Sequence, residues 1–330
     1  MNIISGVCLI LGCFLGAGFV SGREIACYFS QYGNFAYISI VIAVGLFFTL
    51  VMFFFMLSKD TCSVGNFSKS YFGKFSGFAN FMLMLSVLIV SSSMLAGTLS
   101  LAECLNINKY VFVTITIVLT YFIVIGNVKM MSKINSIVVP VLIAIVAIVS
   151  TINIGQGEVC VNAFQSIFSG INYMFINIVS LGMFLLEIGC RYTRKEKVLI
   201  SIISSVIVGV LLVLATTAIS SNNMVSEIMP MLKLAECNKV LFFVTQISIY
   251  FGLFTTLISN VFLLGNYVNS HVGNYKLSVA ISIALSYILS LCGFDIIVGF
   301  VYSIIGVFGI ALVISVCIKE HRNKKSRLKI

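Results

Sequence analysis

The sequence predicts an all-α polytopic membrane protein with ten transmembrane helices. Hydrophobic residues make up 60% of the 330 residues and charged residues only 9%. The mean hydropathy of +1.14 is far above the range of soluble domains. Apolar runs of about 20 residues, the length that crosses a bilayer, recur along the whole chain and leave no room for a soluble domain. We therefore expect residues 1–330 to form a single transmembrane domain.

Each predicted span is an apolar run that ends at a polar or glycine-containing connection. No Lys or Arg precedes the first span and no small-residue cleavage site follows it, so we expect it to stay in the mature protein rather than act as a signal peptide. The predicted spans are Ile3–Gln31, Asn34–Ser58, Phe78–Glu103, Tyr110–Asn127, Ile134–Ile154, Phe164–Gly189, Val198–Ser220, Val240–Tyr267, Leu277–Cys292 and Ile296–Ile318.

The distribution of Lys and Arg predicts the orientation. When the connections are assigned alternately to the two sides, sixteen basic residues fall on one side and four on the other. The positive-inside rule then places both termini in the cytoplasm. The basic tail at residues 319–330 suits a solvated end near lipid headgroups better than a nucleic-acid site. The lipid bilayer is therefore an expected partner, and nucleic acid is not.

Cysteine and histidine offer little material for catalysis or for a metal site. The ten cysteines are scattered singly, and the two histidines, His271 and His321, both lie in predicted cytoplasmic segments. Within a membrane helix, Cys behaves as a small apolar residue. Because the chain also lacks a Ser/His or paired-Asp constellation, we do not expect an enzyme, and we expect no cofactor other than a coupling ion.

The two halves of the chain share a sequence pattern. Glu24-Ile25-Ala26-Cys27 and Glu187-Ile188-Gly189-Cys190 match at an offset of 163 residues, and the same offset relates Ser92-Ser93 to Thr255-Thr256. Five spans per half would make an inverted repeat, which places a substrate site where the two copies meet. Coincidence among similar apolar helices is the alternative. The predicted repeats cover about residues 1–155 and 156–318.

The first span contains helix breakers at its centre. Gly12, Gly16, Gly18 and Gly22 each disfavour helix by about 1 kcal/mol relative to Ala. Non-helical backbone inside a membrane persists only where it lines a cavity or is buried in protein. We therefore predict that this helix is interrupted near the midplane. The alternative is that the glycines only allow close helix packing.

The predicted interruption defines a candidate substrate site. Ser21 and Glu24 have the spacing of a capping box, in which Ser21 would cap a new half-helix and Glu24 would reach back to it. The positive end of that half-helix dipole suits a carboxylate or another anion. The candidate substrate-binding residues in this span are Gly16, Ala17, Gly18, Phe19 and Ser21.

The sixth span is the predicted counterpart of the first, and we expect it to be interrupted as well. Its centre is richer in polar groups than a lipid-facing helix, and Gly182 would permit unwinding. Hydrogen bonding between helices is the alternative use of these groups. The candidate substrate ligands in this span are Asn172, Tyr173, Asn177 and Ser180.

The motif Gly16-Ala17-Gly18-Phe19-x-Ser21-Gly22-x-Glu24-Ile25 resembles the opening motif of the YkvI-like bacterial membrane proteins. That family is similar to the amino acid/polyamine/organocation superfamily, with its LeuT-type fold of five plus five helices. The ten-span layout and the connection containing Glu227-Ile228-x-Pro230 agree with the resemblance. Arg23 departs from it, since a neutral residue such as Gln would be expected. The resemblance implies a secondary transporter in the bacterial cell (inner) membrane.

The expected function is secondary active transport, coupled to a cation, of a small organic solute such as an amino acid. The sequence contains no G-x-x-x-x-G-K-[ST] loop for ATP, so the energy would come from an ion gradient or from exchange. The alternative function is a ligand-sensing, permease-like subunit of the germinant-receptor type, without net transport. An intramembrane enzyme is the least supported of the three hypotheses.

Thr255 and Thr256 lie near the middle of the eighth span. The LeuT-type resemblance implies that such a hydroxyl pair joins carbonyls of the broken first helix around sodium, here from Gly16 to Phe19. An all-oxygen cage suits a hard cation. Proton coupling without a bound ion, and hydroxyls that bond to carbonyls of their own helix, are the alternatives.

Glu24 and Glu187 are the candidate gating residues. A charge deep in a membrane helix costs about 2.5–3.5 kcal/mol on insertion scales. Each has an ordinary explanation, in the capping box for Glu24 and in a pair with Arg191 for Glu187. Their relation by the repeat would place Glu24 at an outward gate and Glu187 at an inward gate.

Overall fold

The structure of the chain is a computed structural model that describes residues 2–58, 64–155 and 163–327. Within these ranges the chain forms helices and turns without a strand. The expected start of the second repeat at 156–162 and the end of the basic tail at 328–330 lie outside the described residues. The helices are α1 (Ile3–Phe14), α2 (Ala17–Val20), α3 (Arg23–Tyr28), η1 (Ser30–Tyr32), α4 (Phe35–Leu57), α5 (Val64–Phe72), η2 (Gly73–Phe75), α6 (Ser76–Cys104), α7 (Lys109–Ile125), α8 (Asn127–Ile152), α9 (Ala163–Ile188), η3 (Gly189–Arg191), α10 (Arg194–Ser221), α11 (Pro230–Leu234), η4 (Ala235–Cys237), α12 (Lys239–Val272), α13 (Tyr275–Ser290), α14 (Phe294–Ile296), the π-helix η5 (Ile297–Val301) and α15 (Tyr302–Arg327).

Every predicted span overlaps at least one of these helices. The first predicted span is divided among α1, α2 and α3, and the last among α14, η5 and α15. In the described part of the chain, six helices are long and apolar enough to cross a membrane, and three shorter apolar helices are α1, α7 and α13. The all-helical fold class is therefore confirmed, whereas the number of ten transmembrane helices stays a prediction.

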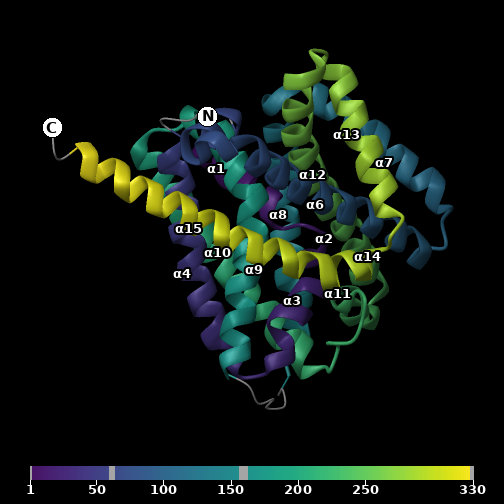
Figure 1. Ribbon diagram of the computed structural model, residues 1–330. Coiled ribbons are helices and arrows are strands. Elements are labelled where there is room, and N and C mark those ends of the chain that lie inside the picture. The colour runs from purple at the N-terminus through teal and green to yellow at the C-terminus, as the bar shows by residue number, and fades with distance from the viewer. Residues whose placement is uncertain (1, 59–63, 156–162, 328–330) are drawn as a thin grey trace.

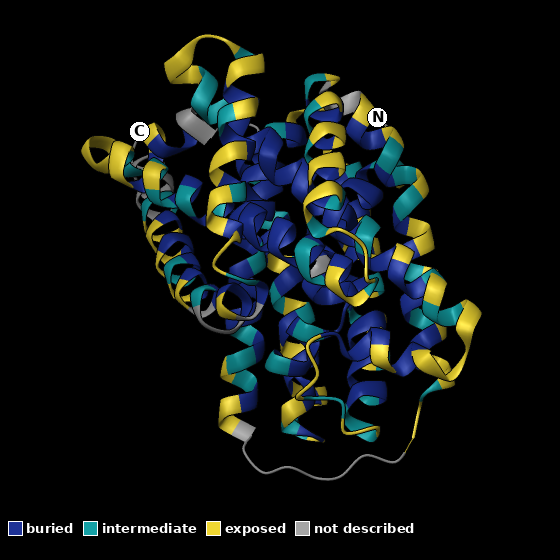
Figure 2. Cartoon of the chain, turned by 90° about the vertical axis from the view of Figure 1, so that its right-hand side faces the viewer, coloured by how far each residue is buried: buried dark blue, intermediate teal, exposed yellow. Residues whose placement is uncertain are grey.

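The long helices form a bundle in which the less apolar helices are the most enclosed. α9 and α12 are largely buried, while more than half of the most apolar part of α4, α8 and α10 is only partly buried or exposed. Figure 2 shows this as a buried centre surrounded by helices with exposed outer faces. Many of the exposed positions are aliphatic, as at Val41 and Ile137, which are both 73% exposed. Such a surface is suited to lipid rather than to water.

The two chain ends lie toward one end of the bundle. Figure 1 shows the N-terminus and the yellow end of α15 in the upper part of the view, with α3 and α11 in the lower part. α15 runs across the face of the bundle and packs along α9. This arrangement places α3, the beginning of α9 and the beginning of α15 around a common region, which is where the candidate site lies.

Local sequence signals set several helix starts. Thr193 and Glu196 form a capping box at the start of α10, in which Glu196 Oε2 accepts the Thr193 N–H at 2.8 Å. The hydrogen bonds from the Thr193 N–H and hydroxyl hold the pKa of Glu196 below its ordinary value. Side-chain oxygens of Asn108, Asn238 and Asn274 accept amide N–H groups at the starts of α7, α12 and α13.

Lys197 joins α10 to the end of α4. Its side chain is 1% exposed, and its Nζ donates to Phe55 O at 2.7 Å and to Ser58 Oγ at 2.9 Å. The Phe55 carbonyl belongs to the last turn of α4, where the helix dipole favours a positive charge. Lys197 therefore acts as a buried C-terminal cap for a neighbouring helix.

We expect Lys197→Met to lower the stability of the protein by about 1–3 kcal/mol, because it removes hydrogen bonds from a charged donor to buried acceptors. The measurement is the apparent melting temperature of the purified chain in detergent. Lys195→Met is the matched control, since Lys195 is exposed on the same turn. Equal melting temperatures for the two variants would contradict the capping role of Lys197.

Candidate functional site

The first apolar span is not one continuous helix. After α1 ends at Phe14, the Gly16 N–H donates to Phe14 O at 2.8 Å, a bond across two residues that makes a tight turn at Leu15. In an uninterrupted helix this N–H would bond to the carbonyl of Gly12. That carbonyl instead accepts the Thr256 hydroxyl of α12 at 3.1 Å. The turn therefore leaves a backbone acceptor available to a distant helix.

The predicted capping box at Ser21 and Glu24 does not form, so this expectation was wrong. The cap of α3 is Gly22, whose φ of +83° lies in the left-handed region that favours glycine. The Ser21 hydroxyl accepts the Arg23 N–H and donates to Gly18 O, each at 3.4 Å. The Glu24 side chain turns away from Ser21 and folds back over Gly18, where an added Cβ would lie 2.1 Å from Glu24 Oε1.

Glu24 is 3% exposed and lies among tyrosines from three helices. Tyr173 of α9 is its neighbour, and Tyr302 of α15 and Tyr28 of α3 lie close to the same group. The Tyr302 hydroxyl in turn bonds to the Ser93 hydroxyl of α6. Within the described residues, Glu24 Oε2 and Tyr173 Oη have no hydrogen-bond partner. The centre of the site therefore holds a buried carboxyl group with an unused acceptor.

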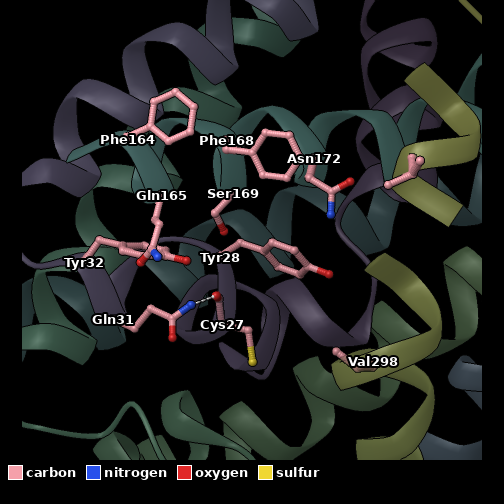
Figure 3. Close-up of a pocket in the computed structure, with 11 residues that line it drawn as sticks. Cys27, Tyr28, Gln31, Tyr32, Phe164, Gln165, Phe168, Ser169, Asn172 and Val298 are labelled. Atoms are coloured by element: carbon pink, nitrogen blue, oxygen red, sulfur yellow. Dashed lines mark hydrogen bonds between the residues drawn. The ribbon is translucent and has the colours of Figure 1, made fainter. Parts of the chain in front are cut away.

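A cavity of about 530 Å³ adjoins this cluster, and Tyr28 is the member of the cluster that lines it. Figure 3 shows that α3, η1 and α9 supply most of its walls, with Val298 of η5 on the far side. Tyr28 and Asn172 point toward each other across it. Tyr28 lies one helical turn after Glu24 on the same face of α3, so Glu24 neighbours a residue that lines the cavity but does not line it itself. The lining residues are Cys27, Tyr28, Gln31, Tyr32, Phe164, Gln165, Phe168, Ser169, Asn172, Val298 and Val307.

The sixth predicted span is a continuous helix, so its expected interruption is corrected. α9 runs from Ala163 to Ile188 without a break. An added Cβ at Gly182 would lie 2.9 Å from the Phe54 ring of α4, so this glycine allows close packing rather than unwinding. The physical reason is that α9 packs along α4 and α15 for much of its length, which favours a regular helix.

The four candidate ligands on α9 have different surroundings. Asn172 and Tyr173 are buried beside the cavity and Glu24, and Asn172 Oδ1 lies against Gly306 of α15. The Asn177 amide donates to Tyr173 O of its own helix at 3.1 Å. Ser180 lies beside the Cys13 thiol of α1, away from the residues that line the cavity. The structure thus brings Asn172 and Tyr173 to the site and leaves Asn177 and Ser180 outside it.

The two threonines of α12 also differ. Thr255 Oγ1 donates to Phe251 O of its own helix at 3.0 Å, whereas Thr256 reaches α1. A Cβ at Gly16 would lie 3.3 Å from Thr256 Oγ1, so Thr256 lies beside the turn. The Gly16 and Phe19 carbonyls accept the backbone N–H groups of Val20 and Gly22, each at 3.0 Å. The carbonyl that Thr256 reaches is therefore that of Gly12, which the sequence did not indicate.

Glu187 is separated from this site. It is half-buried near the end of α9 and lies close to Tyr275 at the start of α13. Fourteen residues separate it from Tyr173 on the same helix, or about 21 Å at 1.5 Å per residue. Glu24 and Glu187 therefore lie at different levels of the bundle, and neither residue lines the cavity.

Sequence reasoning missed the segment that covers the break. Arg23 donates to Glu227 O at 3.0 Å and to Val225 O at 3.4 Å, and the Met231 N–H donates to Ser21 O at 2.9 Å. The connection that leads into α11 is thereby attached to the beginning of α3. Arg23, noted only as a departure from a motif, holds this segment. Tyr302 was missed as well, because no local pattern links the last span to the first.

Comparisons with known proteins agree with this architecture. No protein-family model matches the sequence. The chain is 34% identical over 137 residues to the uncharacterized membrane protein YkvI of Bacillus subtilis (strain 168), and the match spans 40% of each of the two proteins. The crystal structure of MhsT in complex with L-phenylalanine superposes with a TM-score of 0.68 and 15% identity, over 91% of this chain and 80% of that one. This chain resembles YkvI and has the LeuT-type fold.

Two structures of Mhp1 share the fold as well. The inward-facing conformation superposes with a TM-score of 0.65 and 12% identity, over 96% of this chain and 74% of that one. The closed conformation with bromovinylhydantoin bound, described as a nucleobase-cation-symport-1 family transporter, gives 0.63 and 12%, over 87% of this chain and 71% of that one. The resemblance to YkvI-like proteins with a LeuT-type fold, expected from the opening motif, is thereby confirmed.

Proposed function

We propose that the chain is a secondary active transporter of a small organic solute, with its substrate site at the break in the first span. The observation that carries the proposal is the turn at Leu15, together with the buried Glu24 and a cavity of about 530 Å³ that Tyr28, one helical turn after Glu24, helps to line. Interrupted backbone inside a membrane bundle lines sites for solutes and ions. The fold shared with Mhp1, described as a transporter, supports the same function.

The experiment that tests this proposal is uptake by proteoliposomes that contain the purified chain. A labelled pool of amino acids is offered under an imposed sodium gradient, an imposed proton gradient or no gradient. We expect accumulation of at least one solute above the level of empty vesicles. Saturable binding without accumulation would instead support the ligand-sensing subunit, and neither binding nor uptake would reject both functions.

Sodium is the coupling ion that we propose, at a site between α1 and α12. The carbonyl of Gly12 and the hydroxyl of Thr256 already converge, and a Cβ at Gly252 would lie 3.4 Å from the carbonyl oxygen of Leu15. These groups are neutral oxygen ligands of the kind that hard cations prefer. Relative to the expected site, the carbonyls of Gly12 and Leu15 replace those of Gly16 and Phe19 as ligands of the ion. Thr255 contributes less to ion binding than Thr256 does.

We expect Thr256→Val to raise the sodium concentration that gives half-maximal solute binding by about tenfold or more, the equivalent of about 1.4 kcal/mol, because it removes one ligand and keeps the side-chain shape. Thr245→Val is the matched control on the same helix, since Thr245 is buried and donates only to Leu241 O in the described contacts. Solute binding that is indifferent to sodium in the parent protein would reject the site before any variant is made.

The inverted repeat stays a proposal, and one parallel supports it. In each of the related pairs, Ser92-Ser93 and Thr255-Thr256, the first hydroxyl donates to a carbonyl one turn earlier in its own helix. The second hydroxyl of each pair contacts another span, Tyr302 for Ser93 and Gly12 for Thr256. Only the first hydroxyls of the two pairs are therefore parallel, because Tyr302 and Gly12 lie in the tenth and first spans, which the repeat does not relate. The assignment of Glu187 to an inward gate also stays a prediction.

A further inference from the structure

A groove of about 490 Å³ lies on the outside of the bundle, between the end of α8 and the start of α12. These two helices pack against each other along the bundle. None of the residues that line the groove lines the cavity beside Tyr28, so the groove is separate from the proposed substrate site. Its lining residues are Ile145, Ile148, Ile152, Cys237, Asn238, Val240, Leu241 and Val244.

Each helix contributes one apolar stripe to the groove. Ile145, Ile148 and Ile152 are three and four residues apart on α8, which places them on one face of that helix. Val240 and Val244 are four residues apart on α12. Ile152 and Val240 are 61% and 72% exposed. The stripe on α8 extends for about 10 Å at 1.5 Å per residue, and an apolar molecule of this length is needed to cover it.

One end of the groove has a polar rim. Cys237 and Asn238 lie there, and the exposed Lys239 follows as the first residue of α12. The Asn238 side-chain oxygen accepts the N–H groups of Val240 and Leu241, so this oxygen is occupied and the NH₂ group is the donor that the side chain offers to a ligand. Among the described residues, the ion pairs join other lysines, and no carboxylate pairs with Lys239.

The predicted spans place this rim at a surface of the bilayer. The fifth predicted span ends at Ile154 and the eighth begins at Val240, so the rim lies at one membrane boundary and both stripes run inward from it. The hydrocarbon core is about 30 Å thick, so a groove of about 10 Å remains within one leaflet. A partner helix that crosses the membrane would require a groove through both leaflets. A lipid requires only one leaflet.

We propose that the groove binds one anionic phospholipid, with an acyl chain between the two apolar stripes and the phosphate at Lys239 and Asn238. The acyl chain has no polar atom, which suits a lining of Ile, Val and Leu. The phosphate oxygens accept hydrogen bonds from the ammonium of Lys239 and the amide of Asn238. One Lys near a membrane surface favours an anionic lipid by about fivefold.

The rim belongs to the segment that covers the break in the first span. Cys237 is the last residue of η4, which joins α11 to α12. Asn153, next to the end of α8, donates to the Leu234 carbonyl of α11 at 3.3 Å. A lipid at the rim therefore contacts the same segment that Arg23 attaches to α3. Because the lipid binds the folded chain, it stabilises this end of the bundle.

The test is native mass spectrometry of the full-length chain, released from detergent after titration with dioleoylphosphatidylglycerol or dioleoylphosphatidylcholine. These probes have the same acyl chains and differ in the charge of the headgroup. We expect the first phosphatidylglycerol to bind about fivefold tighter than the first phosphatidylcholine. Equal affinities, or tighter binding of phosphatidylcholine, would overturn the proposal. A complex of two chains that phosphatidylglycerol does not dissociate would assign the groove to a second copy and would also overturn it.

A first pair of variants locates the acyl chain. Ile148→Trp fills the groove from the α8 side, and we expect it to weaken the binding of both lipids by about tenfold or more. Ile137→Trp is the matched control, because Ile137 is on the same helix, is 73% exposed and lies outside the groove. Equal lipid affinities of the two variants would show that the lipid binds elsewhere and would overturn the proposal.

A second pair of variants locates the headgroup. We expect Lys239→Gln to lower the affinity for phosphatidylglycerol about fivefold and to leave that for phosphatidylcholine unchanged. Lys276→Gln is the control, because Lys276 is also exposed beside an asparagine-capped helix start but lies outside the groove. Equal phosphatidylglycerol affinities of these two variants would overturn the assignment of the phosphate. Lys239 and Lys276 are both exposed, so this pair decides the outcome even if Ile148→Trp does not fold.

Discussion

Replacement of Gly18 by alanine is expected to abolish solute binding while the protein remains folded. The added Cβ would lie 2.1 Å from Oε1, 2.3 Å from Cδ and 2.4 Å from Cγ of Glu24. Separations this short cannot persist, so the carboxyl group must leave its place over the break. Because the displaced atoms are the end of a flexible side chain, the backbone need not move, and the loss falls on the site rather than on the fold.

The measurement is the affinity of Gly18→Ala for whichever solute the parent chain binds, together with its elution profile from a sizing column. We expect a loss of about a hundredfold or more, equivalent to about 2.8 kcal/mol. Gly77→Ala is the control, because a Cβ there meets nothing within 4 Å. A folded Gly18→Ala with parental affinity would show that the position of Glu24 is irrelevant to binding.

Gly309→Ala is expected to destabilise the packing of α15 against α9. A Cβ at Gly309 would lie 2.6 Å from Phe175 O, 2.9 Å from Val179 Cγ2 and 3.2 Å from Phe175 C. Two of these atoms belong to the backbone of α9, so the two helices would have to separate. Overpacking of this kind costs about 1–3 kcal/mol, and here it also shifts the helix that carries Tyr302 and Val307.

The apparent melting temperature in detergent reports the effect of Gly309→Ala, with Gly45→Ala as the control because a Cβ at Gly45 meets nothing within 4 Å. We expect the control to keep the parental value and Gly309→Ala to fall below it. Solute affinity should fall as well, since α15 forms one wall of the cavity. If Gly309→Ala melts at the same temperature as Gly45→Ala, the prediction is wrong, and α15 does not pack closely against α9 in the purified protein.

The helices follow from the sequence because their signals are local. An apolar run of membrane length leaves the backbone no water to bond with, so it forms a helix wherever it lies. The break in the first span also has a local origin, since four glycines lie close together around Gly16. The sequence indicated Glu24, Tyr173 and Asn172 as candidate site residues by their polarity within apolar spans, although only the structure shows them together.

The same local pattern led to different outcomes at two places. Ser21 and Glu24 have the spacing of a capping box, as do Thr193 and Glu196. Only the second pair forms one, with Glu196 at an accessible helix start. Glu24 lies on the face of α3 that packs against α9, where the glycine at position 18 leaves space for its carboxyl group. Spacing alone does not distinguish these two cases.

The sequence by itself determined the membrane class, the approximate extent of the spans and the place where the first one is interrupted, because hydropathy and glycine content act over a few turns of chain. Only the tertiary structure decided that α9 is unbroken, that Thr256 reaches Gly12 and that Tyr302 comes to Glu24. These contacts join residues that are far apart in the chain. They depend on how rigid helices cross and on which side chains fit between them, and the sequence pattern within one helix contains neither of these quantities.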